Sequence, residues 1–247
     1  MELRHEGIVS LLEHGQDGAM VCPGNDVKAG LKYIVMEYVP HNLLDFSKTM
    51  GAMGEDAGKF FLSQIINVVA YIHQLGVVHR DLKFENIALD TELNLKLLDF
   101  GLASRSNIDS LTDMVGSILY MSPEIHEGNT YSGTKADLFS VGVILYQIVT
   151  GKSPFSEASK EDLFYSQLVE GQIENFFQMK EVEHLSSGFK DLITRLLAYD
   201  PSERPTIDEI RSHSWMREKT IQIEIQPSDK LQKFSPKKNF FSRKIQK

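Results

Sequence analysis

Two short runs of the sequence carry side chains whose types and spacing could do chemistry. The first reads His79-Arg80-Asp81-Leu82-Lys83-Phe84-Glu85-Asn86, and the second, Asp99-Phe100-Gly101, begins thirteen residues after Asn86. Together they bring three carboxylates, those of Asp81, Glu85 and Asp99, an amide and an ammonium group into a short stretch of chain. Carboxylate and amide oxygens are the ligands that Mg²⁺ prefers beside phosphate groups. Such a set suits phosphoryl transfer, which depends mainly on positioning and charge neutralisation.

Five segments in a fixed order make the chain resemble the catalytic domain of eukaryotic protein kinases. The two runs above resemble the family's catalytic loop and the metal-binding motif that follows it. Three later segments resemble the end of the activation segment, the central buried helix and the late arginine motif: 116–124, 137–146 and 200–206. The resemblance covers about residues 5–216. Within the family, the chain looks like the calmodulin-dependent and AMP-activated kinase group. The resemblance implies an α+β, kinase-like fold, with ATP and Mg²⁺ as cofactors and a protein substrate.

The resemblance implies roles for single residues of the two runs. It makes Asp81 the carboxylate that orients the attacking hydroxyl and takes its proton, although an Asp here could also simply cap a turn. Lys83 would place a charge near the transferred phosphate, and a lysine at this position is similar to serine/threonine kinases. Asn86 and Asp99 would bind Mg²⁺. Gly101 would let the backbone turn after Asp99.

A nucleotide pocket is implied on the other side of the predicted site. Met36 would border the adenine ring, although a strand residue of the core would fit the sequence equally well. Glu37 and Val39 would offer backbone hydrogen bonds to the adenine edge. Ala88 stands where the family usually has leucine on the floor of this pocket, which loosens the expected contact.

Other motif residues are expected to support the site. Phe100 is expected to pack the loop onto the core. Asp137 could cap a helix N-terminus, while the resemblance implies that it braces the backbone of the catalytic loop; both roles can hold together. The resemblance also implies a buried ion pair between Glu124 and Arg204 that fixes the activation segment. Breaking such a pair typically costs about 3–5 kcal/mol.

Arg80 precedes the catalytic aspartate, as in kinases that are controlled by phosphorylation of the activation segment. The phosphothreonine usual in the family lies four residues before the position of Ser117, where this chain has Asp113. A carboxylate carries one negative charge where a phosphate carries about 1.5–2. We hypothesise that Asp113 pairs with Arg80 and partly replaces that phosphate. A solvated aspartate, or phosphorylation of Thr112 or Ser110, would fit the sequence as well.

The chain departs from the family pattern at its start. It has no Gly-x-Gly-x-x-Gly motif and no strand lysine, and the glutamate of the regulatory helix would precede Met1. We therefore expect an N-terminally truncated kinase: residues 1–39 as a two-stranded remnant of the small lobe, 40–216 as a mostly helical large lobe and 217–247 as a basic tail. The alternatives are a pseudokinase or interaction module with little catalysis, and a binding protein unrelated to catalysis.

The periodicity of apolar residues predicts the elements around these motifs. Alternation and β-branched residues predict strands over 7–14 and 32–39, which could pair as a hairpin, and short strands at 77–78 and 95–98. Helices are predicted over 55–74, 137–150, 189–197 and 206–215. Gly76 is expected to end the first helix, and the glycine-rich stretch 15–30 is expected to form turns.

Charge and composition limit the function further. Residues 217–247 hold nine basic and three acidic residues, a net of +6, while residues 1–216 carry a net of −14. The acidic body argues against nucleic-acid binding, and the tail could be disordered or contact a partner or an anionic surface. No apolar run is long enough for a transmembrane segment. A lone cysteine, Cys22, favours a reducing compartment, so we expect a cytoplasmic protein.

Overall fold

Helix α4 (Gly133–Thr150) runs through the centre of the molecule, of which the computed structural model describes residues 3–21, 24 and 26–217. Its apolar residues are buried on every side, which is the pattern of a helix enclosed by protein. Helix α2 (Gly54–Gln74) packs along it. The two helices approach closely at Gly58, where a Cβ atom would lie 2.6 Å from Cγ2 of Val149.

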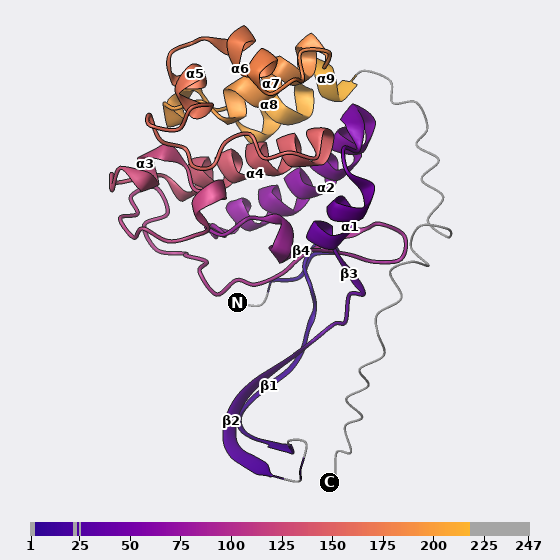
Figure 1. Cartoon of the computed structure of the whole chain (residues 1–247). Coiled ribbons are helices and arrows are strands. Elements are labelled where there is room, and N and C mark those ends of the chain that lie inside the picture. Colours follow the sequence, from indigo (N-terminus) through magenta and orange to yellow (C-terminus); the bar gives the residue numbers. More distant parts are fainter. Residues whose placement is uncertain (1–2, 22–23, 25, 218–247) are drawn as a thin grey trace.

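Shorter helices complete a helical body around α2 and α4. Helices α5 to α9 cover the side of α4 that faces away from the β strands (Figure 1). The bounds of the shorter helices are α1 (Leu43–Met50), α3 (Pro123–His126), α5 (Tyr165–Val169), α6 (Ile173–Met179), α7 (Ser187–Leu196), α8 (Ile207–Ser212) and α9 (Ser214–Arg217). Single 3₁₀ turns are η1 (Phe84–Asn86), η2 (Ile118–Tyr120) and η3 (Pro201–Glu203).

A small antiparallel sheet positions the two sequence runs that could do chemistry. Its strands are ordered β3 (His41–Asn42), β4 (Ile87–Leu89) and β5 (Leu95–Leu97). Ile8 adds an isolated parallel bridge to Leu97. The first run lies between α2 and β4, and the second begins just after β5, so the pairing of β4 with β5 brings the two runs together.

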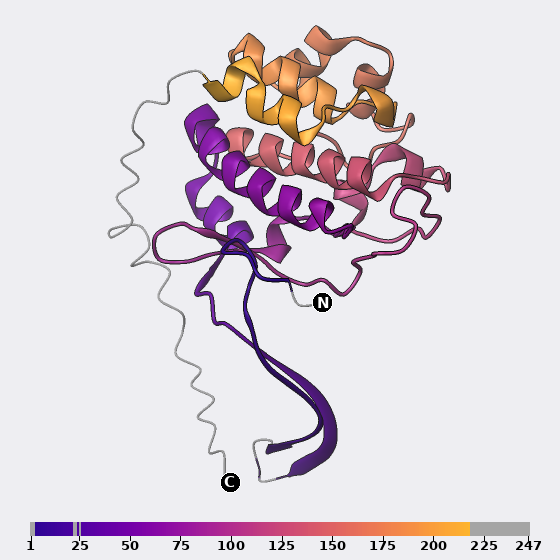
Figure 2. The same cartoon turned by 180° about the vertical axis from the view of Figure 1, so that it is seen from behind.

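A second sheet consists of β1 (Leu11–Val21) and β2 (Val27–Met36), which pair antiparallel and form a long arm. Figures 1 and 2 show this arm projecting away from the helical body. Large apolar side chains remain exposed on it, and Leu12 and Ile34 are each 65% exposed. A two-stranded sheet buries little surface by itself, so the arm lacks a core of its own.

The predicted helices agree closely with the structure where apolar periodicity is strong. Helix α2 ends before Gly76, whose φ of 66° is the left-handed conformation expected of that position. Helix α4 begins at Gly133, four residues earlier than predicted. The single helix predicted over 206–215 is wrong, because His213 has an extended backbone and separates α8 from α9. Thr206 caps α8 in a capping box with Glu209.

The predicted strands paired as expected but their bounds were wrong. The structure continues both strands of the arm through the glycine-rich stretch that was expected to form turns. Gly15 and Gly18 are accommodated because the ring of Tyr33 lies over them: a Cβ atom at either position would come within 2.6 Å of it. At residues 77–78 the structure has only an isolated bridge from Val78 to Ser104.

Three remaining expectations concern the membrane, the tail and the cysteine. Within the described part of the chain, none of the helices combines the length and the apolar character needed to cross a bilayer. Cys22 and residues 218–247 of the basic tail lie outside the described residues, while Arg217 ends α9.

Candidate active site

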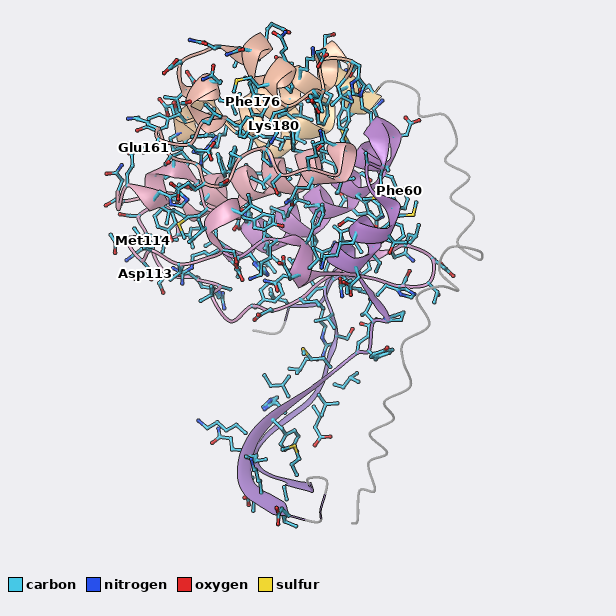
Figure 3. All side chains as sticks on the ribbon, in the orientation of Figure 1. Phe60, Asp113, Met114, Glu161, Phe176 and Lys180 are labelled. Atoms are coloured by element: carbon cyan, nitrogen blue, oxygen red, sulfur yellow. The ribbon has the colours of Figure 1, made fainter. Side chains whose placement is uncertain are left out.

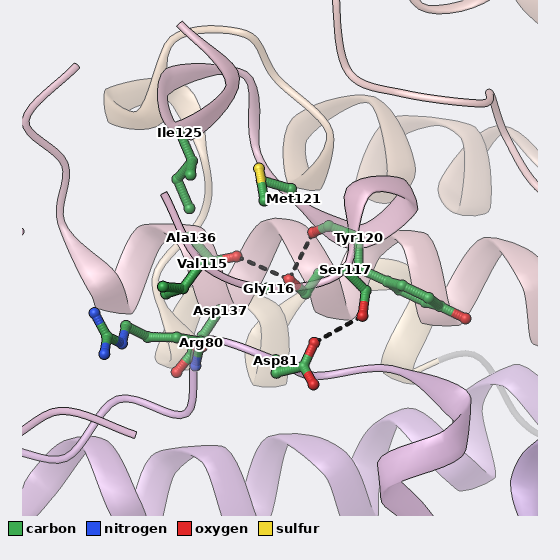
Figure 4. Close-up of a pocket in the computed structure, with 11 residues that line it drawn as sticks. Arg80, Asp81, Val115, Gly116, Ser117, Tyr120, Met121, Ile125, Ala136 and Asp137 are labelled. Atoms are coloured by element: carbon green, nitrogen blue, oxygen red, sulfur yellow. Dashed lines mark hydrogen bonds between the residues drawn. The ribbon is translucent and has the colours of Figure 1, made fainter. Parts of the chain in front are cut away.

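The carboxylate of Asp81 lies at the centre of the candidate site. Its Oδ2 accepts a hydrogen bond from Asn86 Nδ2 over 3.0 Å and lies 2.8 Å from Lys83 Nζ. Its Oδ1 accepts the hydroxyl of Ser117 over 2.9 Å (Figure 4). Asp81 is buried, and Asn86 Nδ2 also donates to its backbone carbonyl over 2.8 Å. These donors fix one orientation of the carboxylate, as a group that orients and deprotonates a hydroxyl requires.

Asp137 of α4 holds the loop that carries Asp81. Its Oδ1 accepts the backbone N–H of Arg80 and its Oδ2 that of His79, both over 2.9 Å. Oδ2 also lies 2.8 Å from Nε2 of His73, at the end of α2. A carboxylate that is 1% exposed needs such partners, because an unpaired buried charge is costly. Asp137 lies within α4 and not at its start, so the predicted N-cap role is wrong, while the bracing contact is present.

Asp99 is joined to the catalytic loop through the main chain. Leu98 N donates to Asn86 O over 2.8 Å, which places the start of the second run beside the end of the first. Asp99 has a left-handed φ of 52°, and its Oδ1 accepts the backbone N–H of Gly101 over 3.0 Å. A Cβ atom at position 101 would lie 2.9 Å from that oxygen, so glycine avoids a crowded contact. Asp99 itself is exposed.

His79 and Phe100 link the two runs to the core. Their rings meet edge to face with centroids 5.0 Å apart, and His79 Nε2 lies 2.9 Å from Leu98 O. His79 is fully buried and Phe100 is packed against the main core. These are the contacts of packing residues.

The donor set of the site fits Mg²⁺. Asn86 uses Nδ2 to bind Asp81, which leaves its amide oxygen as an acceptor, and Asp99 contributes a carboxylate. Within residues 3–21, 24 and 26–217, His, Cys, Asp and Glu form no cluster of three that could hold a metal. Mg²⁺ commonly takes one or two protein oxygens and completes its shell with phosphates and water. Asn86 and Asp99 are therefore the residues that would hold it.

Arg80 connects the catalytic loop with the segment that leads to Ser117. Its Nε donates to Leu102 O over 2.6 Å, and its Nη1 lies 3.1 Å from Asp113 Oδ2. Tyr131 also contacts Asp113, because the Tyr131 hydroxyl donates a hydrogen bond to Asp113 O over 3.0 Å. Asp113 lies at the edge of the body and its side chain is 65% exposed (Figure 3). The neighbouring Thr112 is also exposed.

Glu124 and Arg204 form a bidentate ion pair inside the body. The two guanidinium nitrogens of Arg204 donate to the carboxylate over 2.7 and 2.6 Å, and the residues are 7% and 1% exposed. Arg204 also donates to the carbonyls of Ala198 and Lys135. Paired charges with this many hydrogen bonds are the form in which ions are stable in a protein interior. The pair fixes the end of the segment, at α3, to the turn before α8.

The residues expected around adenine lie where the arm meets the body. Ala88 is buried in β4, opposite Asn42 and Lys96. Met36, at the end of β2, is 52% exposed. Glu37 donates its N–H to Ser10 O over 2.9 Å. The pKa of the Glu37 carboxyl is lowered by the hydrogen bond from Ser10 N–H and by the ammonium of Lys96, 3.1 Å away.

Val39 completes this set of residues. It is half-buried just after β2 and lies between the arm and β3. The structure thus places Met36, Glu37 and Val39 on one connecting segment and Ala88 on the sheet beside it.

Sequence reasoning missed three partners of the site. In the sequence, His73 looks like an ordinary residue of the last turn of α2, yet it contacts Asp137. Tyr131 carries no motif signal, and the contact of Ser117 with Asp81 was not foreseen. All three contacts join residues that are 18 to 64 positions apart, so only the tertiary fold reveals them.

Known proteins resemble this chain over most of its length. The family model of the protein kinase domain matches residues 1–216. Mouse (Mus musculus) testis-specific serine/threonine-protein kinase 1 is 38% identical over 197 residues, which cover 77% of this chain and 53% of the mouse protein. Rice (Oryza sativa) serine/threonine protein kinase OSK3 is 40% identical over 187 residues, which cover 75% of this chain and 35% of the rice protein.

A rye protein matches a slightly longer part of the chain. The carbon catabolite-derepressing protein kinase of Secale cereale is 37% identical over 203 residues, covering 81% of this chain and 39% of the rye protein. The chain therefore spans only about a third to a half of the length of these relatives. The match over residues 1–216 confirms the resemblance that the motifs carried: the chain belongs to the protein kinase family, and its relatives are of the serine/threonine type.

Proposed function

We propose that the chain is an ATP-dependent serine/threonine protein kinase, which transfers the terminal phosphoryl group of ATP to a hydroxyl of a protein substrate. One observation carries the proposal: the Asp81 carboxylate is held in place by Lys83, Asn86 and Ser117 on a loop that Asp137 anchors to the central helix. A carboxylate fixed in this way can orient a hydroxyl and accept its proton.

Each remaining residue has a part in this proposal. Lys83 places a positive charge beside Asp81 and neutralises charge on the transferred group. Asn86 and Asp99 would hold Mg²⁺, which when bound neutralises the charge of the ATP phosphates. Met36, Glu37, Val39 and Ala88 would form the nucleotide side of the site.

The proposed division of the chain into domains rests on the net charge of its segments and on the separation of arm and body. Residues 1–39 would be the remnant of the small lobe, 40–216 the large lobe and 217–247 a separate basic tail, in a cytoplasmic protein. The two-stranded arm supports the first assignment and the helical body the second. The net charge of +6 supports a tail that contacts an anionic partner or surface.

A second candidate function is a pseudokinase or interaction module, and the arm favours it. The sequence contains no glycine-rich phosphate loop, and β1 and β2 project away from the body (Figure 2). A kinase uses such a loop to position the phosphates, and lost positioning lowers the rate of transfer strongly. We therefore expect weak binding of Mg·ATP and low activity from these 247 residues.

The test is phosphorylation of serine and threonine peptides by the purified chain at millimolar Mg·ATP, followed with radiolabelled ATP. Asp81→Asn is expected to lower the transfer rate by about 10²–10⁴-fold, the usual contribution of a positioned base. Asp90→Asn is the matched control, because the Asp90 carboxylate lies in the turn between β4 and β5, where it accepts hydrogen bonds from Asn94 and Glu92. Equal transfer by the Asp81→Asn chain would contradict the proposed role, and no transfer by any chain would favour the pseudokinase.

A further inference from the structure

The hydroxyl of Ser117 lies between the two charged groups of the catalytic loop. Ser117 Oγ donates to Asp81 Oδ1 over 2.9 Å and accepts from Lys83 Nζ over 2.8 Å. Asp81 is in turn oriented by Asn86 Nδ2 over 3.0 Å. A hydroxyl that is bonded to a base, with the base oriented by a third group, is the arrangement of an activated nucleophile. Ser117 therefore occupies the environment that a substrate hydroxyl needs.

Close packing of the backbone keeps Ser117 in this position. Gly116 has a φ of 114°, and a Cβ atom there would lie 2.7 Å from Arg80 O, so the segment rests directly on the catalytic loop. A cavity of only about 10 Å³ remains between them, lined by Asp81, Ser117 and Tyr120 among others (Figure 4). This is about the space of one water molecule. The structure thus leaves little freedom for the two groups to separate.

Ser117 remains accessible from outside. The residue is half-buried, and its neighbours Ile118 and Met114 are each 61% exposed. Other hydroxyls of the same segment are placed differently: Ser110 and Thr112 are exposed, and neither contacts Asp81 in the described part of the chain. Of these three hydroxyls, that of Ser117 is the one that is both accessible to solvent and in contact with the Asp81 carboxylate.

We propose that Ser117 is an intramolecular phosphoryl acceptor of this site, and that its phosphorylation turns the site off. The inference rests on the proposed kinase function, which supplies ATP as the donor. In the step, Ser117 Oγ bonds to the γ-phosphorus while the bond from that phosphorus to the β–γ bridging oxygen breaks. ADP leaves with the electron pair, and the hydroxyl proton passes to Asp81 Oδ1.

The product would block further transfer for electrostatic and steric reasons. A phosphate on Ser117 adds a charge of about −1.5 to −2 next to the Asp81 carboxylate. It also attracts the ammonium of Lys83, which lies 2.8 Å from Ser117 Oγ in the unmodified chain. A substrate hydroxyl then loses both the base and the cation that would position it. Phosphorylation of Ser117 by this site therefore inhibits the site itself.

The first experiment locates the phosphate. The full chain is dephosphorylated, the phosphatase is removed and Mg·ATP is added. Tryptic cleavage after Arg105 and Lys135 releases one peptide that contains every hydroxyl of the segment, and fragment spectra locate the modified residue. We expect phosphate at Ser117 at a rate independent of protein concentration, none in the Asp81→Asn chain, and no change in the matched control Ser106→Ala, which alters an exposed serine of the same peptide.

The second experiment measures the consequence of the modification. Phosphoserine is introduced during synthesis at position 117, or at position 106 as the control, because Ser106 is exposed in the same segment. Phosphoserine at 117 is expected to lower peptide phosphorylation by about a hundredfold or more, because the base is lost, and phosphoserine at 106 is expected to leave it unchanged. A third readout needs no ATP: Asp81→Asn should raise the Tm of the phosphoserine-117 chain more than that of the unmodified chain, because it removes a like-charge contact.

The outcomes separate the two proposals. If peptides are phosphorylated but Ser117 is not, this inference is wrong and the proposed function stands. If neither is phosphorylated, both are overturned. A rate of Ser117 phosphorylation that rises with protein concentration would contradict the intramolecular step. Full activity of the phosphoserine-117 chain would contradict inhibition by the modification.

Discussion

The helical body and the β arm use the same kinds of apolar residue with opposite results. In the body, Ile144 and Leu145 are fully buried by the helices around α4. In the arm, Ile34 and Leu12 are each 65% exposed, although β-branched and aliphatic residues suit a strand. The difference lies in the partners that each region finds. Apolar residues stabilise a fold only where other elements cover them.

The two regions also divide the site between them. Asp81, Asn86 and Asp137 belong to the body, which holds them through α4 and the sheet of β3 to β5. Met36 and Glu37 lie at the base of the arm, where Glu37 contacts Ser10 and Lys96. The proposed transfer groups are therefore held by the helical body, while Met36 and Glu37 of the proposed nucleotide side lie at the base of the arm.

The largest expected effect tests whether global stability resides in the body. Arg204→Ala leaves Glu124 buried without its partner and should lower the free energy of unfolding by about 3–5 kcal/mol. Urea unfolding followed by circular dichroism measures it. The control in the arm is Tyr33→Phe, which removes the 2.6 Å hydrogen bond to Glu13 and should not change the global transition. A loss below about 1 kcal/mol for Arg204→Ala would contradict this account of the pair.

A second pair of variants compares tight glycine contacts in the two regions. Gly58→Ala places a methyl group 2.6 Å from Val149 Cγ2, where α2 and α4 pack closely. Overpacking of this kind costs about 1–3 kcal/mol. Gly15→Ala crowds the ring of Tyr33 in the arm and should change hydrogen exchange of β1 and β2 only. If Gly15→Ala lowered the stability of the whole chain as much as Gly58→Ala, the arm and the body would have to be one cooperative unit.

A smaller effect is expected from pH, through Glu55 at the start of α2. Burial raises its pKa, but hydrogen bonds from Ser186 and from the indole of Trp215 outweigh this and hold the pKa below its usual value. A carboxyl with a depressed pKa in the folded state stabilises the fold above its unfolded pKa. That contribution is lost as pH falls through the folded pKa.

The measurement is the free energy of unfolding at steps between about pH 5 and pH 3. Glu55→Gln should lower stability at neutral pH and flatten the decline in acid. Glu13→Gln in the arm is the control and should leave the pH profile of the global transition as it is. An unchanged acid decline in Glu55→Gln would show that other carboxyls account for it.

The smallest effect concerns the contact between Arg80 and Asp113. The Asp113 side chain is 65% exposed, so Asp113→Asn should change global stability by only about 0.2–1 kcal/mol. Hydrogen exchange over residues 108–116 should still become faster, because the segment loses its ionic contact with the catalytic loop. Asp109→Asn is the control on the same segment. Unchanged exchange in Asp113→Asn would dispose of the idea that this carboxylate replaces a phosphate.

The sequence predicted the parts of the molecule in which the signal is local. Helix α2 follows from apolar residues that repeat at helical spacing, and its end follows from Gly76. Asp81, Asn86 and Asp99 could be found because they lie in two contiguous runs with a fixed spacing. Such signals need no knowledge of which distant segments meet.

The features that could not be predicted depend on contacts between distant segments. The strands of the arm extend through Gly15 and Gly18 because Tyr33 of the opposite strand covers them, and a glycine-rich stretch otherwise indicates a turn. His73 contacts Asp137 across 64 positions, and neither residue reveals the other in the sequence. The position of Asp137 inside α4 was not predicted either: the helix already starts at Gly133, which packs closely against Val78 and Leu111 from distant parts of the chain.

The anchoring of the catalytic loop to Asp137 has one further consequence. Because that carboxylate belongs to a helix that is buried on every side, unfolding of α4 would remove the hydrogen bonds to His79 and Arg80, and the sheet of β3 to β5 alone would not hold the loop. Damage anywhere along α4 should therefore disable the chain in an all-or-none manner. Chains that still contain an assembled α4 should keep their loop geometry intact, however disordered the arm becomes.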